Sequence, residues 1–231
     1  MLSVISCNSR KLPLNGGIIF LEDNYSISNE EKYFVRSEIL KSESEVKSIL
    51  YSLPDSINVV VEKVDWDLDQ VGGVSGRTES NNPPIIYIQF SKNYKNGNLD
   101  SLKMGIKSTI FHEFHHISRG WAIQDNKFEY GIDNAMVNEG LAVVFSEEYT
   151  GKTYNPNSFD EEADLWIKEI IDLPKNVSYS DWVSGTHPDG RTYIAYRSGN
   201  YLIQKSMSLS EKNILELSEL SPSEIINLAG Y

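Results

Sequence analysis

Residues 101–120 read SLKMGIKSTIFHEFHHISRG, and this stretch decides how the rest of the chain is interpreted. Its apolar residues recur at spacings of three and four, a pattern typical of a helix with one side in the core. They are Leu102, Ile106, Ile110, Phe114 and Ile117. Asp100 or Ser101 is a suitable N-cap, and Gly120 stands where a glycine commonly ends a helix. We therefore expect one amphipathic helix across this stretch.

Residues 112–116 of this helix have the form H-E-x-x-H. His112 and His116 are four residues apart, so on a helix they lie one turn apart on one face and can bind one metal ion. Glu113 is badly aimed to bind that ion, but its carboxylate can reach a water beside it. The motif indicates two zinc-binding histidines and the general base of a metalloprotease. A chance match on a polar helix is the alternative, but Phe114 points nearly opposite His112, and three of the chain's four histidines lie here.

A catalytic zinc site commonly has three protein ligands and one water, so a third ligand is needed. A second helix is expected from Asp133 or Asn134 through Tyr149, and it is buried because it is apolar nearly all round. Glu139 is the one charge inside its apolar run, and a buried charge needs a partner or a metal. Gly140 beside it would let another backbone, or the metal helix, approach closely. The alternatives are His187, Glu129 and Asp133 as ligands, or an ion pair of Glu139 with Arg119 or Arg197.

Length and composition are those of an ordinary globular protein, with 231 residues, 40% hydrophobic and 23% charged. The formal net charge of −12 argues against DNA, RNA or anionic membranes as partners. Cys7 is the only cysteine, which excludes an intrachain disulfide and a cysteine-rich zinc cluster. No apolar run approaches the length of a membrane span, and no oligomeric state is indicated.

The first seven residues do not form a normal signal peptide, because they lack a basic region and a long apolar run. A cytoplasmic protein is therefore expected. Val4-Ile5-Ser6-Cys7 does resemble the end of a bacterial lipoprotein signal. If the true start lies upstream, Cys7 would be a lipidated first residue and the protein would be exported.

Predicted strands lie early in the chain and predicted helices lie late. The strand candidates are Ile18–Leu21, Val59–Val61 and Ile85–Phe90, the last with the strongest signal, and the first helix candidate is Glu30–Leu53. Beyond residue 150, helices are expected at Phe159–Leu173, at Arg191–Met207 and after the capping box at Ser221–Glu224. This order indicates an α+β fold, with a small N-terminal mixed sheet packed on the H-E-x-x-H helix and a mainly helical C-terminal half.

Residues 112–116, followed by Asn138-Glu139-Gly140-Leu141-Ala142, resemble the gluzincin pattern. Within it the chain resembles a bacterial family of predicted zinc-dependent proteases that is catalogued as a domain of unknown function. Its members carry an H-E-x-x-H helix, a downstream E-G-L-A helix, and a C-terminal helix with tyrosine and glycine, to which residues 193–201, YIAYRSGNY, are similar. The resemblance covers roughly Gly72 to Tyr231. It implies Glu139 as third ligand and a zincin-like fold with Ile85–Phe90 near the metal helix.

The chain departs from that pattern at Val143, where many gluzincins carry an aspartate that orients the first histidine. Ligand histidines are usually held by a carboxylate or a backbone carbonyl, so another group must take this role. The carboxylate candidates are Asp125, Asp133, Glu147 and Asp181. We divide the chain into an N-terminal segment of unassigned role, residues 1–60, and a zincin-like metallopeptidase domain, residues 61–231.

The expected function is a zinc metallopeptidase with one zinc ion per chain. Zinc would lower the pKa of a water, and Glu113 would take its proton during attack on the carbonyl and pass it to the leaving amine. Tyr196 is the first candidate for a donor to the oxyanion. Tyr193, His187 and Arg197 are the further candidates. The alternative for the tyrosines is packing at a helix surface, and His115 is expected to be structural or a donor in the cleft wall.

The expected substrate is a peptide or protein, and Ile85–Phe90 could pair with an extended peptide by β-addition. Residues 72–78 would either border the groove or form a surface hairpin. A zinc hydrolase of a small amide or ester would use the same residues, but in a pocket closed at both ends. A binding or chaperone-like module with a structural zinc is the third hypothesis. Glu113 argues against it, because a structural site needs no base.

Overall fold

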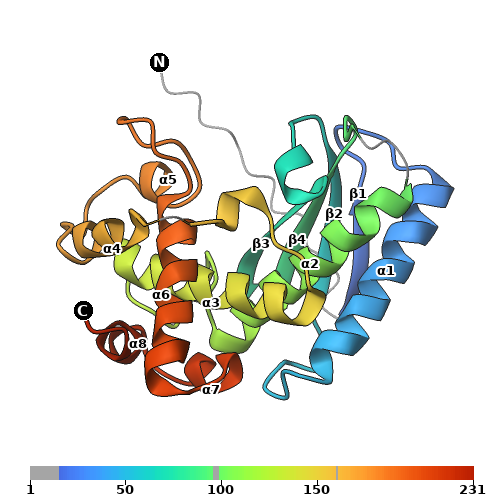
Figure 1. Ribbon diagram of the computed structural model, residues 1–231. Coiled ribbons are helices and arrows are strands. Elements are labelled where there is room, and N and C mark those ends of the chain that lie inside the picture. Colours follow the sequence, from blue (N-terminus) through green and yellow to red (C-terminus); the bar gives the residue numbers. More distant parts are fainter. Residues whose placement is uncertain (1–15, 96–98, 160) are drawn as a thin grey trace.

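The computed structural model describes residues 16–95, 99–159 and 161–231, so Cys7 lies outside the described residues. The strands are β1 (Gly17–Leu21), β2 (Asn58–Val64), β3 (Val74–Asn81) and β4 (Pro84–Ser91). The helices are α1 (Asn29–Lys47), α2 (Leu99–Arg119), α3 (Ile132–Thr150), α4 (Ala163–Ile171), α5 (Tyr179–Trp182), α6 (Ile194–Ser210), α7 (Ile214–Ser218) and α8 (Pro222–Leu228). Figure 1 shows the sheet and α1 on one side of the molecule and the later helices on the other. The α+β prediction is confirmed.

The four strands form one mixed sheet in the order β1-β2-β4-β3. β1 and β2 run parallel, as do β2 and β4, whereas β3 runs antiparallel to β4 and has an irregular register between Thr78 and Ser80. β4 is therefore an inner strand, hydrogen-bonded on both sides. The prediction that Ile85–Phe90 pairs with a peptide is wrong, because neither edge of that strand is free for β-addition. The edge strand of this end of the sheet is β3.

One face of the sheet is covered by α2. The register sets Val74, Gly76 and Thr78 of β3 opposite Phe90, Ile88 and Ile86 of β4, and all but Gly76 are buried. A Cβ atom at Gly76 would lie 2.6 Å from Thr109 Cγ2 and 2.7 Å from Glu113 Oε1, so this face of β3 touches the helix that carries the motif. Packing against the sheet thus fixes the position of α2 and places Glu113 beside the edge strand β3.

α3 and α6 cross at two glycines. A Cβ atom at Gly140 would lie 2.4 Å from the carbonyl carbon of Gly199, and one at Gly199 would lie 2.2 Å from Met136 O. The close backbone approach expected at Gly140 is therefore present, and its partner is α6 rather than the metal helix. Residues 198–200 lie inside α6 and do not interrupt that helix.

Several predicted helix ends shift. α1 ends at Lys47 instead of Leu53, and the predicted helix Phe159–Leu173 is shortened to Ala163–Ile171. The predicted capping box before the last helix is present, since Ser221 Oγ accepts from Glu224 N and Glu224 Oε2 accepts from Ser221 N. None of the helices in the described ranges combines the length and apolar character needed to cross a bilayer.

Candidate metal centre

Three side chains from two helices meet at one point. His112 and His116 come from α2 and Glu139 comes from α3, and the two Nε2 atoms lie 3.0 Å apart. Each Nε2 atom lies 3.2 Å from the same oxygen, Glu139 Oε2. This triangle is close to the spacing of about 3.3 Å between ligand atoms in tetrahedral zinc sites with bonds of about 2.0–2.1 Å. Among the described residues these three form a group that could hold a metal ion.

The donor set fits a cation better than a hydrogen-bonded network. The Nε2 atom of a neutral imidazole donates or accepts according to its tautomer, whereas an ionised Glu139 Oε2 only accepts, so in every combination of neutral tautomers at least one of these three contacts joins two donors or two acceptors. Two imidazoles and a carboxylate are ligands suited to zinc. Although burial acts to raise it, His116 and His112 hold the pKa of Glu139 well below its ordinary value. Glu139 is therefore ionised, as a metal ligand must be.

Trp121 holds the other oxygen of Glu139. Its indole Nε1 donates to Glu139 Oε1 at 3.0 Å, and both residues are buried. Neither Arg119 nor Arg197, the two partners considered for Glu139, makes an ion pair with it in the described ranges. Arg119 instead donates to Asn138 Oδ1 at 2.9 Å and to the Leu220 carbonyl at 3.1 Å.

Glu113 lies at the border of α2 and β3. It is buried, and Thr78 Oγ1 donates to its Oε2 at 2.9 Å. Gly76 leaves room for the other oxygen, Oε1, at the edge of the sheet. Burial raises the pKa of Glu113 to about 7, which outweighs the lowering by His112. A carboxylate with a pKa close to neutral is suited to take and return a proton.

Of the three tyrosines in residues 193–201, two line the pocket and the third packs elsewhere. Tyr196 stacks on His112, with ring centroids 6.1 Å apart and an interplanar angle of 20°. Burial and the neighbouring Glu139 raise the pKa of Tyr196 well above its ordinary value, so its hydroxyl stays a donor. Tyr193 also lines the pocket beside the motif, whereas Tyr201 packs against Phe159.

The other candidates lie elsewhere. His187 Nδ1 is 2.9 Å from Asp189 Oδ1 and its ring packs on Trp182, and neither His187 nor Arg197 lines the pocket. Glu129 pairs with Lys175. His115 is fully buried with Nε2 2.8 Å from Ser218 Oγ, which matches the structural one of its two predicted roles.

In the described part of the chain, no carboxylate is hydrogen-bonded to the Nδ1 atom of His112 or His116 to orient the ring. His116 Nδ1 is buried and has no hydrogen-bond partner there. Of the four candidates, Asp125 accepts from Ser80 and Glu147 accepts from Asn200. Sequence reasoning also missed Trp121 and Thr78, since neither stands at a recognisable spacing from the glutamate that it contacts.

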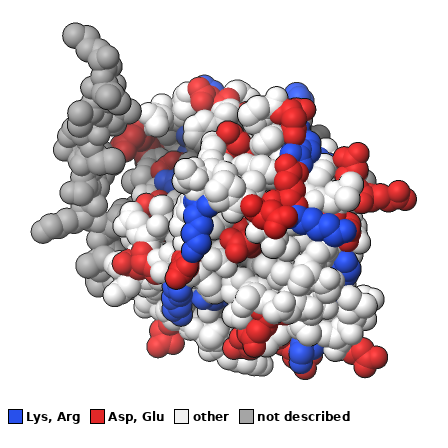
Figure 2. Space-filling model, turned by 90° about the vertical axis from the view of Figure 1, so that its left-hand side faces the viewer, with Lys and Arg blue, Asp and Glu red and all other residues white. Residues whose placement is uncertain are grey.

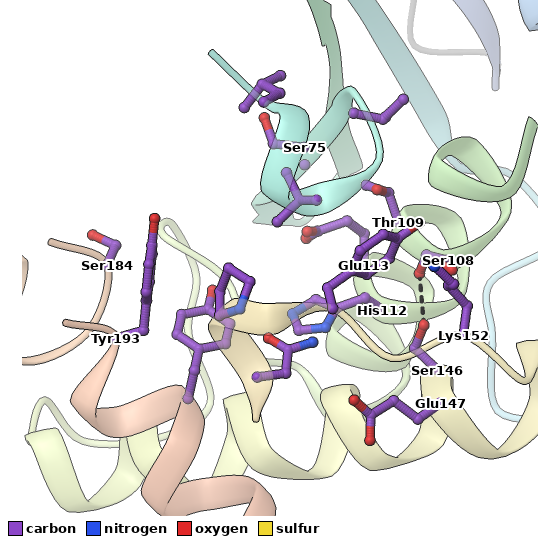
Figure 3. Close-up of a pocket in the computed structure, with 18 residues that line it drawn as sticks. Ser75, Ser108, Thr109, His112, Glu113, Ser146, Glu147, Lys152, Ser184 and Tyr193 are labelled. Atoms are coloured by element: carbon purple, nitrogen blue, oxygen red, sulfur yellow. Dashed lines mark hydrogen bonds between the residues drawn. The ribbon is translucent and has the colours of Figure 1, made fainter. Parts of the chain in front are cut away.

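A pocket of about 310 Å³ opens beside His112 and Glu113. Figure 3 shows these two side chains on α2, Ser75 on the β3 side, Glu147 on α3 and Tyr193 beside α6. Val74, Ser75 and Gly76 contribute to its wall, so the glycine-containing segment borders the pocket, as one of its two expected roles required. Its lining also includes residues outside these strands and helices, such as Leu68, Tyr154 and Ser184, so the pocket is built from segments that are far apart in the sequence.

One family model matches residues 57–227, the greater part of the chain, and its description is "Predicted Zn-dependent protease (DUF2268)". The matched range includes β2 to β4, α2, α3 and α6, and with them every residue of the metal centre and Glu113. No curated protein and no solved structure matches the chain.

Proposed function

We propose that this chain, which belongs to the DUF2268 family of predicted Zn-dependent proteases, is a zinc metallopeptidase that hydrolyses peptide bonds. His112, His116 and Glu139 would hold one zinc ion. The observation that carries the proposal is the triangle of 3.0–3.2 Å formed by these three side chains, with the buried Glu113 next to it at the pocket.

Glu113 is proposed as the general base. A zinc ion bound beside it would lower the pKa of water and polarise the scissile carbonyl. Glu113 takes the proton of the attacking water and returns it to the leaving amine. The Thr78 hydroxyl, which donates to Oε2, holds the carboxylate in place for both transfers. Such fixed positioning of the base is part of what lowers the barrier.

Tyr196 is proposed as the donor to the developing oxyanion. Its hydroxyl remains protonated, and its ring is held parallel to that of His112. A donor that is already oriented before the reaction stabilises developing charge without reorganisation. Tyr193 lines the same pocket and is the second candidate for this role.

The edge strand β3 is proposed to bind the substrate backbone in place of β4. Ser91 N donates to Gly73 O, so the alternation of an antiparallel pair turns the polar groups of Val74 and Gly76 away from β4. Further along β3, Ile123 N and Gln124 N already bond to Thr78 O and Glu79 O. In the described ranges the free part of this edge is therefore the part beside Glu113, where an extended peptide could add as a strand.

Metal content and cleavage test the proposal together. Wild-type protein is expected to hold about one zinc ion per chain by elemental mass spectrometry and to cleave members of a peptide library. Glu139→Ala is expected to lose most of the zinc, and Glu113→Gln to keep the zinc but lose cleavage. Glu148→Ala, an exposed change on the same helix, is the control and keeps both.

The same measurements can contradict it. Absence of zinc in the wild type after zinc is added back would remove the enzyme hypothesis. Zinc retained by Glu139→Ala would move the third ligand to another residue. Cleavage retained by Glu113→Gln would show that the proposed base is wrong.

A further inference from the structure

The pocket extends beyond the metal centre along α3. Glu147 lies about two turns after Glu139 on that helix and lines the pocket at some distance from the histidines (Figure 3). Apart from Glu113 it is the one acidic side chain among the described residues of the lining. No step of the proposed mechanism uses it. Its presence in the wall calls for a separate explanation.

The carboxylate of Glu147 is only half satisfied. Its Oε2 accepts from Asn200 Nδ2 at 3.3 Å, whereas its Oε1 is buried without a hydrogen-bond partner in the described ranges. Burial raises the pKa of Glu147 despite the lowering effects of Asn200 and Thr153. A partly buried carboxylate without a cationic partner costs free energy, part of which a cation bound in the pocket would recover.

The chain does not supply that cation from the pocket itself. Lys152 is the one basic side chain in the described lining, and it is exposed. Its Nζ lies 5.2 Å from the centre of the Tyr154 ring, and no ion pair with Glu147 is formed in the described ranges. Glu147 therefore has no cationic partner in the described ranges, although its side chain lines the pocket.

The remaining wall suits the stem of a long side chain. Leu68, Val71, Val74 and Pro156 supply apolar surface, while Ser108, Ser146 and Asn157 are polar. Lysine and arginine combine an apolar stem with a charged tip, so they can bury the stem along such a wall while the tip meets a carboxylate. A neutral aliphatic side chain would leave the charge of Glu147 without a partner.

We propose that Glu147 selects substrates with a lysine or arginine next to the bond that is cleaved, an inference that rests on the proposed peptidase function. The pocket opens beside Glu113, so a residue that flanks the scissile bond is the one that can enter it. The basic tip then pairs with the Glu147 carboxylate, and the rest of the side chain lies along the apolar wall. Glu147 acts here as a specificity residue and takes no part in the chemical step.

The test compares arginine with citrulline, its neutral counterpart of nearly the same shape. Two peptide sets carry one arginine or one citrulline at each successive position of an otherwise neutral sequence. Binding is measured by calorimetry to the zinc-loaded Glu113→Gln protein, in which the peptides are not cleaved. At the best position arginine is expected to bind about tenfold more tightly or better, since close charge pairs couple by at least this amount.

Variants at Glu147 and at its neighbour Glu148 distinguish a direct contact with the arginine side chain from a general electrostatic attraction. In Glu113→Gln/Glu147→Gln the advantage of arginine is expected to fall below about twofold. In Glu113→Gln/Glu148→Gln, which removes an equal charge from the exposed side of α3, it is expected to remain. An advantage that survives Glu147→Gln, or that is absent at every position from the start, overturns the inference.

Cleavage by the wild type keeps the two proposals apart. Metal-dependent cleavage of both peptide sets at equal rates would support the peptidase and overturn the selection of basic residues. Arginine-specific binding that depends on Glu147, without any metal-dependent cleavage, would support the basic side-chain site and overturn the peptidase.

Discussion

At the scale of single residues, the two carboxylates at the centre share one arrangement. Trp121 donates to Glu139 Oε1 and leaves Oε2 facing the histidines. Thr78 donates to Glu113 Oε2 and leaves Oε1 near Gly76 at the edge of the sheet. A neutral donor thus fixes one oxygen of each glutamate, while the other oxygen is directed to the function proposed for it. Because both donors are uncharged, neither of them neutralises the carboxylate that it holds.

Replacement of Trp121 by phenylalanine tests this arrangement. Trp121→Phe keeps a ring in the core but removes the only indole N–H that reaches Glu139 Oε1 in the described ranges. Because partners of this kind orient metal ligands, zinc affinity is expected to fall about 10–100-fold. Competition with a chelator measures the affinity. Trp182→Phe, the same change at a buried tryptophan beside His187, is the control, and an equal loss there would refute the role of Trp121.

At the scale of helices and strands, the local pattern predicts elements well and their partners poorly. α2 and α3 were predictable because the apolar spacing of one and the apolar run of the other are properties of short stretches. Strand order depends on pairing between distant segments, and β4, the strand with the strongest signal, is an inner strand of the sheet. Its hydrogen bonds to β2 and β3 on both edges remove β4 from peptide binding. The edge strand β3, with its glycine and polar residues, gave the weaker signal.

The residues of the candidate metal site and its neighbouring Glu113 were predictable to a similar degree. His112, Glu113 and His116 follow from one motif, and Glu139 follows from a charge in an apolar helix. The stacking of Tyr196 on His112 depends instead on how α6 crosses α3, which no spacing in the sequence encodes. The position of Glu147 in the pocket wall likewise depends on how distant segments pack. The sequence predicts Glu147 only as one of four candidates to orient a histidine.

The crossing of α3 and α6 can be tested at Gly199. Gly199→Ala would place a Cβ atom 2.2 Å from Met136 O, and the rigid backbone of α3 must move to make room. Overpacking of this kind is expected to lower the free energy of unfolding by about 1–3 kcal/mol. Since α3 carries Glu139, zinc affinity is expected to fall with it. Urea unfolding and chelator competition measure the two effects, and unchanged stability would show that α6 adjusts without cost.

At the scale of the whole molecule, the sheet joins segments on both sides of the predicted boundary at residue 60. That position lies inside β2, and β1, outside the matched range, pairs with β2. The division into two segments stays a prediction. Figure 2 shows acidic and basic side chains interspersed over one face of the molecule. The exclusion of nucleic acid as a partner, which was argued from the net charge, likewise stays a prediction.

A cluster around Asp164 ties the C-terminus to two helices and makes stability depend on pH. Asp164 of α4 accepts from Lys168 Nζ at 2.6 Å, from Lys205 Nζ of α6 at 3.1 Å, and from the Tyr231 hydroxyl. Hydrogen bonds from Lys168, Tyr231 and Lys205 hold the pKa of Asp164 below its ordinary value. A carboxyl with a lowered pKa stabilises the fold above its unfolded pKa of about 3.9 and loses that contribution as the pH falls through its folded pKa.

Asp164→Asn is therefore expected to destabilise the protein at neutral pH but not in strong acid. The loss at pH 7 is expected to be about 0.5–1 kcal/mol, the range of partly exposed ion pairs. It should shrink as the pH is lowered below about 4, because the Asp164 carboxyl of the unfolded wild type becomes neutral there and that of the folded wild type becomes neutral at still lower pH. Urea unfolding of both proteins at several pH values measures the difference. Asp172→Asn, an exposed change at the end of α4, serves as the control. A difference that stays constant down to strong acid would mean that the Asp164 cluster stabilises the fold through shape rather than charge.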